Sequence, residues 1–353
     1  MWLSNRTDLA AGARAAQGAL TRRQLFICTA AGASLICGCG PDALAATAPD
    51  GAQALGPEVA EQPLIRISPH VHMIVAPGSF PSADNAGFMS NLIFVVGRDG
   101  VMAIDSGSST RIAQMGLRQL KKLTSLPVIG LINTHFHGDH WLGNQAFAET
   151  FGKALPIHAM AGTRAAIEGA LGVNWRDSMV GWTGDATRGT QIVPPNHDID
   201  HGATFDLGGV TLKLHHYGVA HTPFDLSVEV VEDRVMCAGD IIMNKRIAVM
   251  DDGSFQGALK AFDALEKNSQ TAIWIPAHGA AGADVLRWNR ELFEGIYGTC
   301  VEAVKNGVAI DAALPLVLKD PRVAARASET NGFERNIGRY VSRAYLEAEE
   351  SQF

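Results

Sequence analysis

The chain has 353 residues, with 29 Lys or Arg and 36 Asp or Glu, which gives a formal net charge of −7. A mildly acidic chain without a run of Lys and Arg argues against nucleic acid and anionic membranes as partners. The hydrophobic fraction of 47% is ordinary for a globular α/β protein, so a chain of this length can bury one large core.

The amino-terminal 45 residues carry the pattern of an export signal. Residues 21–26 (Thr-Arg-Arg-Gln-Leu-Phe) resemble a twin-arginine motif, and the apolar run 25–37 after it is shorter than the roughly 20 residues that span a membrane. The sequence Ala-Leu-Ala at 43–45 predicts cleavage after Ala45. A second interpretation, ranked below the first, is a lipoprotein acylated at Cys39. We expect a periplasmic or secreted protein whose mature chain has no transmembrane segment.

The rest of the chain is predicted to form a linker, a folded domain and a helical extension. Residues 46–63 are rich in Ala, Pro and Gly and predict the linker. From Leu64 to residue 285, short apolar strands alternate with helical patterns, and 286–353 is mostly helical. Helices are predicted at 111–123, 144–151, 161–171, 283–306 and 333–349.

One segment concentrates metal-binding side chains directly after a predicted strand. Residues 128–132 (Val-Ile-Gly-Leu-Ile) have the apolar, β-branched composition of a buried strand. Residues 134–140 follow with the sequence Thr-His-Phe-His-Gly-Asp-His. The segment therefore lies at the carboxyl end of a strand, where α/β sheets commonly bind ligands. The candidate metal ligands in it are His135, His137, Asp139 and His140.

The spacing within this segment predicts two metal ions. His135 and His137 are two residues apart and in extended backbone would point the same way, so they can hold one ion together. A glycine then lets the chain turn, so that Asp139 and His140 can face a second ion. Imidazoles with a carboxylate suit zinc, and the same set also accepts iron.

Three further candidate ligands follow later strands. Each lies where an apolar run, at 210–216, 228–237 or 272–275, gives way to a loop that contains Gly or Pro. The equivalent placement argues that they share one site with the histidine segment. These residues are His221, Asp240 and His278.

Together these motifs, over roughly 64–282, resemble the metallo-β-lactamase-fold hydrolase superfamily; residues 103–107 (Ala-Ile-Asp-Ser-Gly) are similar to its aspartate–glycine turn. The resemblance implies a four-layer αβ/βα sandwich with a dinuclear site, to which this chain adds a C-terminal helical extension. It implies that the first ion is held by His135, His137 and His221, the second by Asp139, His140 and His278, and both by Asp240. It also implies that Asp105 braces the site from behind.

The resemblance further implies the chemistry. A hydroxide that bridges two zinc ions would attack the carbonyl of an ester, thioester or amide, and Asp139 would orient the nucleophile or carry its proton. The expected partner is therefore a small-molecule substrate. The segment 133–147 is most similar to exported zinc hydrolases associated with quinoprotein relays and sulfur oxidation, a branch that names no substrate.

Other functions stay open at this point. A β-lactam hydrolase is one alternative, although that branch commonly has Cys at the position of Asp240 and Lys at that of Met243. Aspartate at that position is more similar to glyoxalase II, a thioesterase. A third alternative is a non-catalytic metal-binding protein that serves a periplasmic redox system, against which the full set of seven ligands argues.

Several residues near these motifs have two interpretations each. Asp225 is a candidate to support the ligands, since the stretch His-Thr-Pro-Phe-Asp departs from the family pattern. Lys245 and Arg246 either bind a substrate carboxylate or face solvent. Residues 172–189, with Trp175 and Trp182, predict a loop that overhangs the site or packs on the core.

Overall fold

The computed structural model describes residues 54–352. The predicted export signal, its cleavage site and Cys39 lie outside the described residues. Within 54–352, no helix combines the length and the apolar composition that crossing a membrane requires.

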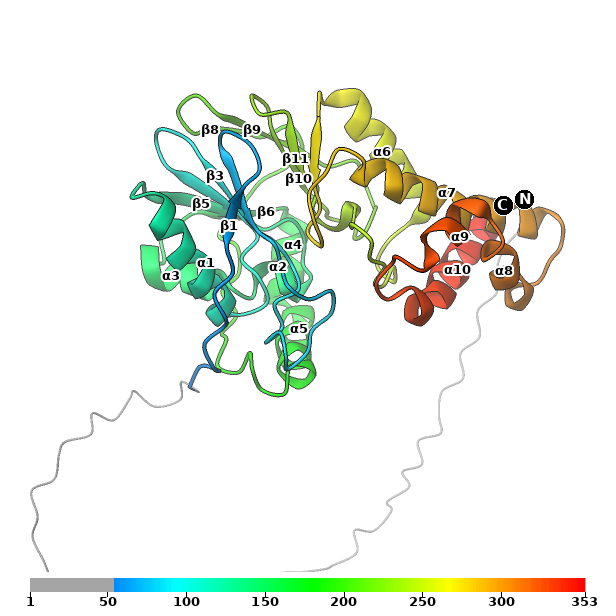
Figure 1. Cartoon of the computed structure of the whole chain (residues 1–353), viewed down its shortest axis with the longest axis horizontal. Helices are drawn as coiled ribbons and strands as arrows, with labels where there is room; N and C mark the ends of the chain where they lie inside the picture. The colour runs from blue at the N-terminus through cyan, green and yellow to red at the C-terminus, as the bar shows by residue number, and fades with distance from the viewer. Residues whose placement is uncertain (1–53, 353) are drawn as a thin grey trace, which may run out of the picture. The chain divides into compact units, whose positions relative to one another are not determined.

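The described residues form two β-sheets (Figure 1). In the seven-stranded sheet the strands lie in chain order: β1 (Leu64–Arg66), β2 (Val71–Ile74), β3 (Leu92–Val96), β4 (Val101–Ile104), β5 (Val128–Ile132), β6 (Ile157–Ala159) and β7 (His197–Asp198). β1 to β4 pair antiparallel, and β4 to β7 pair parallel. The five-stranded sheet has the order β12 (Ile273–Ile275), β11 (Val235–Cys237), β10 (Ser227–Val230), β9 (Thr211–His215) and β8 (Thr204–Asp206).

Helices cover the outer face of each sheet. Figure 1 shows α1 (Thr110–Leu123) and α3 (Asn144–Phe151) beside the seven-stranded sheet, and α6 (Phe255–Asn268) beside the other. The remaining helical elements are α2 (Gly138–Trp141), α4 (Ala161–Glu168), α5 (Ala170–Trp182), η1 (Gly239–Ile241), α7 (Val285–Lys305), α8 (Ile310–Val317), α9 (Pro321–Ala327) and α10 (Phe333–Glu350).

Alternation along the strands explains the four layers. In β3, Leu92 and Phe94 pack in the cluster that contains Ile112 of α1, whereas Ile93 and Val95 pack between the sheets. Successive strand residues point to opposite faces, so a strand with both faces apolar needs a layer on each side. The αβ/βα sandwich with C-terminal helices that the sequence predicts is confirmed.

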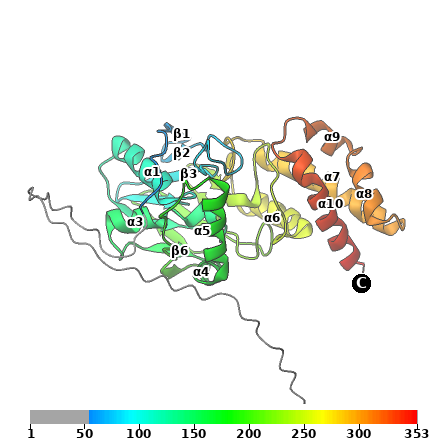
Figure 2. The ribbon, with the colours of Figure 1, turned by 90° about the horizontal axis from the view of Figure 1, so that it is seen from below.

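The C-terminal helices share a core with the second sheet. α7 and α10 pack along each other, as both views show (Figures 1 and 2). Tyr340 of α10 lies 5.5 Å from the ring centre of Phe255 in α6 and 6.1 Å from that of Phe293 in α7. This aromatic packing joins α10 to the sandwich through buried side chains.

Three sequence predictions of elements were wrong. The run 228–237 is a hairpin, with β10 and β11 paired antiparallel and Arg234 in the left-handed region at φ 53°. Most of the predicted loop 172–189 is helical, because α5 runs to Trp182. The predicted helix 161–171 is interrupted at Gly169, where α4 ends and α5 begins.

Candidate metal centre

The histidine segment changes backbone conformation at Gly138. The chain leaves β5, bends at residues 135–137, where His137 itself has an extended backbone at ψ 138°, and then enters the short helix α2. The imidazoles before the turn and the side chains after it therefore leave the backbone in different directions. Glycine is needed at the turn because a Cβ there would lie 2.9 Å from the Cβ of Trp175 in α5.

The structure brings all seven predicted ligands together. Their ligand atoms form two groups, and within each group these atoms lie within 4.8 Å of one another. All seven side chains are buried. One group is His135, His137, His221 and Asp240, and the other is Asp139, His140 and His278.

Asp240 lies between the two groups. Its Oδ2 is 3.4 Å from Nε2 of His221, and its Oδ1 is 3.2 Å from Nε2 of His278. One carboxylate oxygen therefore faces each group, which is the arrangement that a shared ligand requires. The loop after β11 sets this position, because Gly239 adopts φ 59° directly before the aspartate.

Five inward-facing atoms of the site have no hydrogen-bond partner among the described residues. A buried polar atom without a partner normally costs free energy, so a cluster of such atoms indicates a binding site for a cation. Two divalent cations would satisfy them all. The orphaned atoms are Nε2 of His135, His140 and His278, Oδ2 of Asp139 and Oδ1 of Asp240.

The electrostatics also fit bound cations. Burial lowers the pKa of His135, and lowers that of His221 to about 3, so both imidazoles are neutral and keep a free lone pair. Burial alone would raise the pKa of Asp139 and Asp240, but the facing imidazoles, among them His140, hold both well below the usual range. Against burial, the facing aspartates raise the pKa of His140 and His278, so these two imidazoles would release a proton when a cation takes its place, since neutral imidazoles and ionised carboxylates are the forms that bind metals.

The outer nitrogen of four imidazoles is held by a neighbouring group. Such contacts fix the ring orientation and leave the inner nitrogen for the metal. Nδ1 of His278 donates to the carbonyl of Met89 (2.6 Å), and Nε2 of His137 lies 3.1 Å from Oδ2 of Asp252. The other two pairs are His135 Nδ1 with Thr134 Oγ1 (3.1 Å) and His140 Nδ1 with Asp105 Oδ2 (2.8 Å).

The two predicted supporting aspartates contact the site differently. Asp105 accepts hydrogen bonds from the backbone and hydroxyl of Thr134, beside its contact with the His140 ring. Asp225 instead holds the backbone, since its carboxylate accepts from the N–H groups of His221 and Thr222 at 2.8 Å. Burial, opposed by these hydrogen bonds, raises the pKa of Asp225 to about 6.

The comparisons agree with this geometry. Residues 85–280, more than half of the chain, match the family model described as the metallo-beta-lactamase superfamily. The chain belongs to the metallo-beta-lactamase superfamily. No curated protein matches the chain.

Solved structures support the assignment at the level of the fold. A metallo-beta-lactamase from Pontibacter korlensis is 19% identical, with a TM-score of 0.54 over 66% of this chain and 99% of its own. DIM-1 metallo-beta-lactamase exposed to ceftazidime is 16% identical, with a TM-score of 0.52 over 67% of this chain and 99% of its own. VMB-1 is 16% identical, with a TM-score of 0.51 over 66% of this chain and 96% of its own.

An open pocket of about 340 Å³ leads to the metal centre of this superfamily member. Trp175 and Trp182 of α5 line it, and the Trp175 ring lies 4.9 Å from that of His137. Both tryptophans therefore overhang the site, but from a helix rather than a loop. Of the two predicted cations, Arg246 lines this pocket and is buried, whereas Lys245 is exposed and pairs with Glu329.

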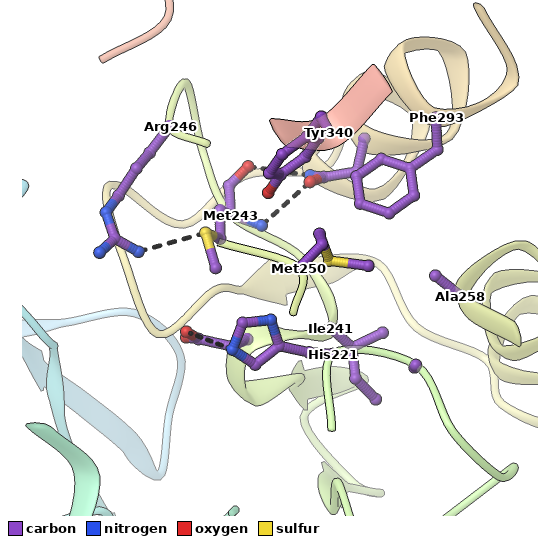
Figure 3. A pocket seen from close by; sticks show the side chains of 11 residues that line it. His221, Ile241, Met243, Arg246, Met250, Ala258, Phe293 and Tyr340 are labelled. Atoms are coloured by element: carbon purple, nitrogen blue, oxygen red, sulfur yellow. Dashed lines mark hydrogen bonds and ion pairs between the residues drawn. The ribbon is translucent and has the colours of Figure 1, made fainter. Parts of the chain in front are cut away.

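Beside the candidate metal ligands lies a small cavity of about 10 Å³, roughly the space of one water molecule (Figure 3). His221 reaches it, and its Nδ1 is a buried atom without a hydrogen-bond partner. Asn289 and Phe293 of α7 and Tyr340 of α10 form the far wall. The C-terminal helices thus contribute to this side of the site.

Proposed function

We propose that this protein is an exported, dinuclear metal-dependent hydrolase that acts on a carbonyl compound, an ester, thioester or amide. The observation that carries the proposal is the position of Asp240, with one carboxylate oxygen toward each of two buried ligand groups. Membership of the superfamily and the orphaned inner atoms support it. The sequence similarity to exported hydrolases of quinoprotein-relay and sulfur-oxidation type remains part of the proposal.

Each ligand has a role in this proposal. Two divalent ions, when bound, would supply a hydroxide at neutral pH and polarise the substrate carbonyl. The first ion would be held by His135, His137 and His221, the second by Asp139, His140 and His278, and both by Asp240. We propose zinc for both ions, with iron as the alternative that the same ligands accept.

In this proposal, side chains that line the pocket position the attacking water and stabilise the charge that develops on the substrate. Asp139 lines the pocket, and its Oδ2 lies 3.3 Å from Nε2 of His278, so the carboxylate can orient the attacking water and accept its proton. Trp175, whose ring lies 4.9 Å from that of His137, would shield one side of the ligand cluster from bulk water. Dry walls strengthen the electrostatic stabilisation of the negative charge that develops on the carbonyl oxygen.

Activity of metal-free and metal-loaded protein tests this function. Purified protein is stripped with a chelator, reloaded with zinc or iron, and assayed on 4-nitrophenyl acetate, lactoylglutathione and nitrocefin. We expect metal-dependent hydrolysis of the ester or thioester, and Asp139→Asn should lower kcat by about 100-fold or more. Asp177→Asn, at an exposed carboxylate of α5, is the matched control.

The panel also separates the alternative functions. Preferential turnover of nitrocefin would favour a β-lactam hydrolase, and preferential turnover of lactoylglutathione a glyoxalase II-like enzyme. A metal-loaded protein that is inactive on a broad panel of esters, thioesters and amides would support a metal-binding accessory protein and contradict the proposal.

Export is a separate part of the proposal and rests on the pattern at 21–45. Cell fractionation should find the protein outside the cytoplasm, and replacing Arg22 and Arg23 by Lys should retain it inside. Equal export of the double variant would contradict the twin-arginine assignment. Labelling with a fatty acid would detect the lipoprotein alternative at Cys39.

A further inference from the structure

Two arginines from distant parts of the chain flank one aromatic ring at the pocket. Arg246 is only 5% exposed; its Nε donates to the carbonyl of Ser79 (2.6 Å), and its guanidinium carbon lies 4.9 Å from the ring centre of Phe80. The guanidinium carbon of Arg335, on α10, lies 5.1 Å from the same ring centre. All three side chains line the open pocket above the metal centre.

Neither arginine has a carboxylate partner among the residues that the structure describes. Within residues 54–352, no ion pair forms with Arg246 or Arg335, whereas Arg339, one turn further along α10, pairs with Asp251. Arg335 is exposed, but the guanidinium of Arg246 is buried, and a buried guanidinium is costly without a counter-ion, so an anion bound to it would be stabilised. Asp139 and Asp240 also line the pocket, but in the metal-loaded protein their charge is offset by the ions.

The lining of the same pocket also contains two tryptophans. Trp182 is 51% exposed and lies edge-to-face with Trp175, at 5.9 Å between ring centres. An exposed tryptophan beside a buried metal site offers a surface for an apolar group of a ligand. The pocket lining therefore combines arginines, tryptophans and candidate metal ligands.

We propose that the substrate is an amphiphilic anion, whose carboxylate or similar group binds to Arg246 and Arg335 and whose apolar part packs on Trp175 and Trp182. The inference rests on the proposed function, because it names the substrate class of that site. Arg335 lies beyond residue 280, where the family match ends. The C-terminal helix α10 thus supplies a residue that selects the substrate, in addition to its packing role.

Binding of two probes to the zinc-loaded protein tests the inference. Benzylsuccinate has a phenyl ring, one carboxylate for the metals and a second for the arginines, whereas 4-phenylbutanoate lacks the second carboxylate. By calorimetry we expect benzylsuccinate to bind about tenfold more tightly, since a charge-assisted contact of this kind contributes on that order. Arg335→Gln should reduce this ratio to about twofold or less, and Arg335→Lys should restore part of it.

Arg287→Gln is the matched control, because Arg287 is exposed on α7, pairs with Asp284 and is not among the residues that line the pocket. It should leave the ratio unchanged. The inference is overturned if the wild-type protein shows no preference for the dianion, or if Arg335→Gln keeps it. Binding can be measured without turnover. If the protein hydrolyses no substrate but prefers benzylsuccinate over 4-phenylbutanoate as expected, only the proposed function is contradicted. If the protein hydrolyses esters but shows no preference for benzylsuccinate, only this inference is contradicted.

Discussion

At the scale of single residues, Asp105 is the residue outside the ligand set that orients a candidate ligand through a strained backbone. It has a left-handed backbone, φ 57°, which costs a non-glycine residue roughly 1–3 kcal/mol. The strained turn aims its carboxylate at Thr134 and at the ring of His140. The hydrogen bonds that it makes there offset part of the strain. The strained backbone therefore serves to orient the ring of His140.

Loss of this carboxylate should weaken metal binding. Asp105→Asn keeps the size of the side chain but removes the charged acceptor that fixes His140. We expect a 10- to 100-fold lower affinity for the metals, on the order of what supporting contacts contribute, measured by competition with a coloured chelator. Asp177→Asn, on the surface, should bind metal like the wild-type protein. Equal affinity in the two variants would show that Asp105 has no such role.

A second prediction at this scale concerns pH. Burial, with a smaller effect from His197, lowers the pKa of His158 from 6.5 to about 4. Between these values the unfolded chain binds a proton that the folded chain does not, so the free energy of unfolding falls as the pH drops from 6.5 through 4. The loss is at most roughly 3 kcal/mol.

Replacing His158 by Phe should remove this part of the acid sensitivity, because the ring stays but cannot take up a proton. Urea unfolding at several pH values between 4 and 7 would measure the slope for both proteins. A variant with the same slope as the wild-type protein would exclude His158 as its source.

At the scale of elements, α10 stabilises the start of α6. Glu347 accepts hydrogen bonds from the backbone of Phe255 (2.8 Å) and Gln256 (3.0 Å) and from the hydroxyl of Ser254. These N–H groups have no partner within their own helix, and the positive end of the helix dipole favours a carboxylate. One side chain of the C-terminal extension therefore caps a helix of the sandwich.

Glu347→Gln should lower the free energy of unfolding by about 1 kcal/mol, because an acceptor oxygen remains but its charge is lost. Thermal unfolding at low ionic strength would show a decrease in Tm of a few degrees. Glu350→Gln, at the exposed end of the same helix, is the comparison. If both variants unfold at the same temperature, the capping contact contributes nothing measurable.

Elements with one strong local signal were predicted well. β5 and α3 have the expected bounds, because apolar β-branched residues and a helical pattern between clear breaks determine them. α5 was predicted as a loop, since its glycines each disfavour a helix by about 1 kcal/mol. Its packing on Gly138 and His137 overrides that preference, and packing of this kind has no local signature.

The same limit applies to the candidate site. The histidine segment and the strand ends predicted the seven residues that converge. Asp252 and the carbonyl of Met89 were not found, because neither stands in a motif and each meets its histidine only through the fold. Arg335 was missed for the same reason, since the sequence shows it as one of several charged residues on a helix.

At the scale of the whole molecule, the fold gathers ligands from both sheets at one edge. The parallel strands β4 and β5 lead to Asp105 and the histidine segment, and the second sheet leads to His221, Asp240 and His278. The chain carries a net charge of −7, yet its arginines and metals would make this one pocket cationic. Such a local positive potential attracts anionic ligands to the pocket rather than to the rest of the acidic surface.

The metal content of the intact protein tests the central claim most directly. Protein purified from its native compartment, or reloaded with excess zinc and then desalted, should contain two metal ions per chain by elemental analysis. His278→Ala should retain about one, because only the second group loses a ligand. A wild-type protein that holds one ion or none under these conditions would contradict the dinuclear centre and the mechanism built on it.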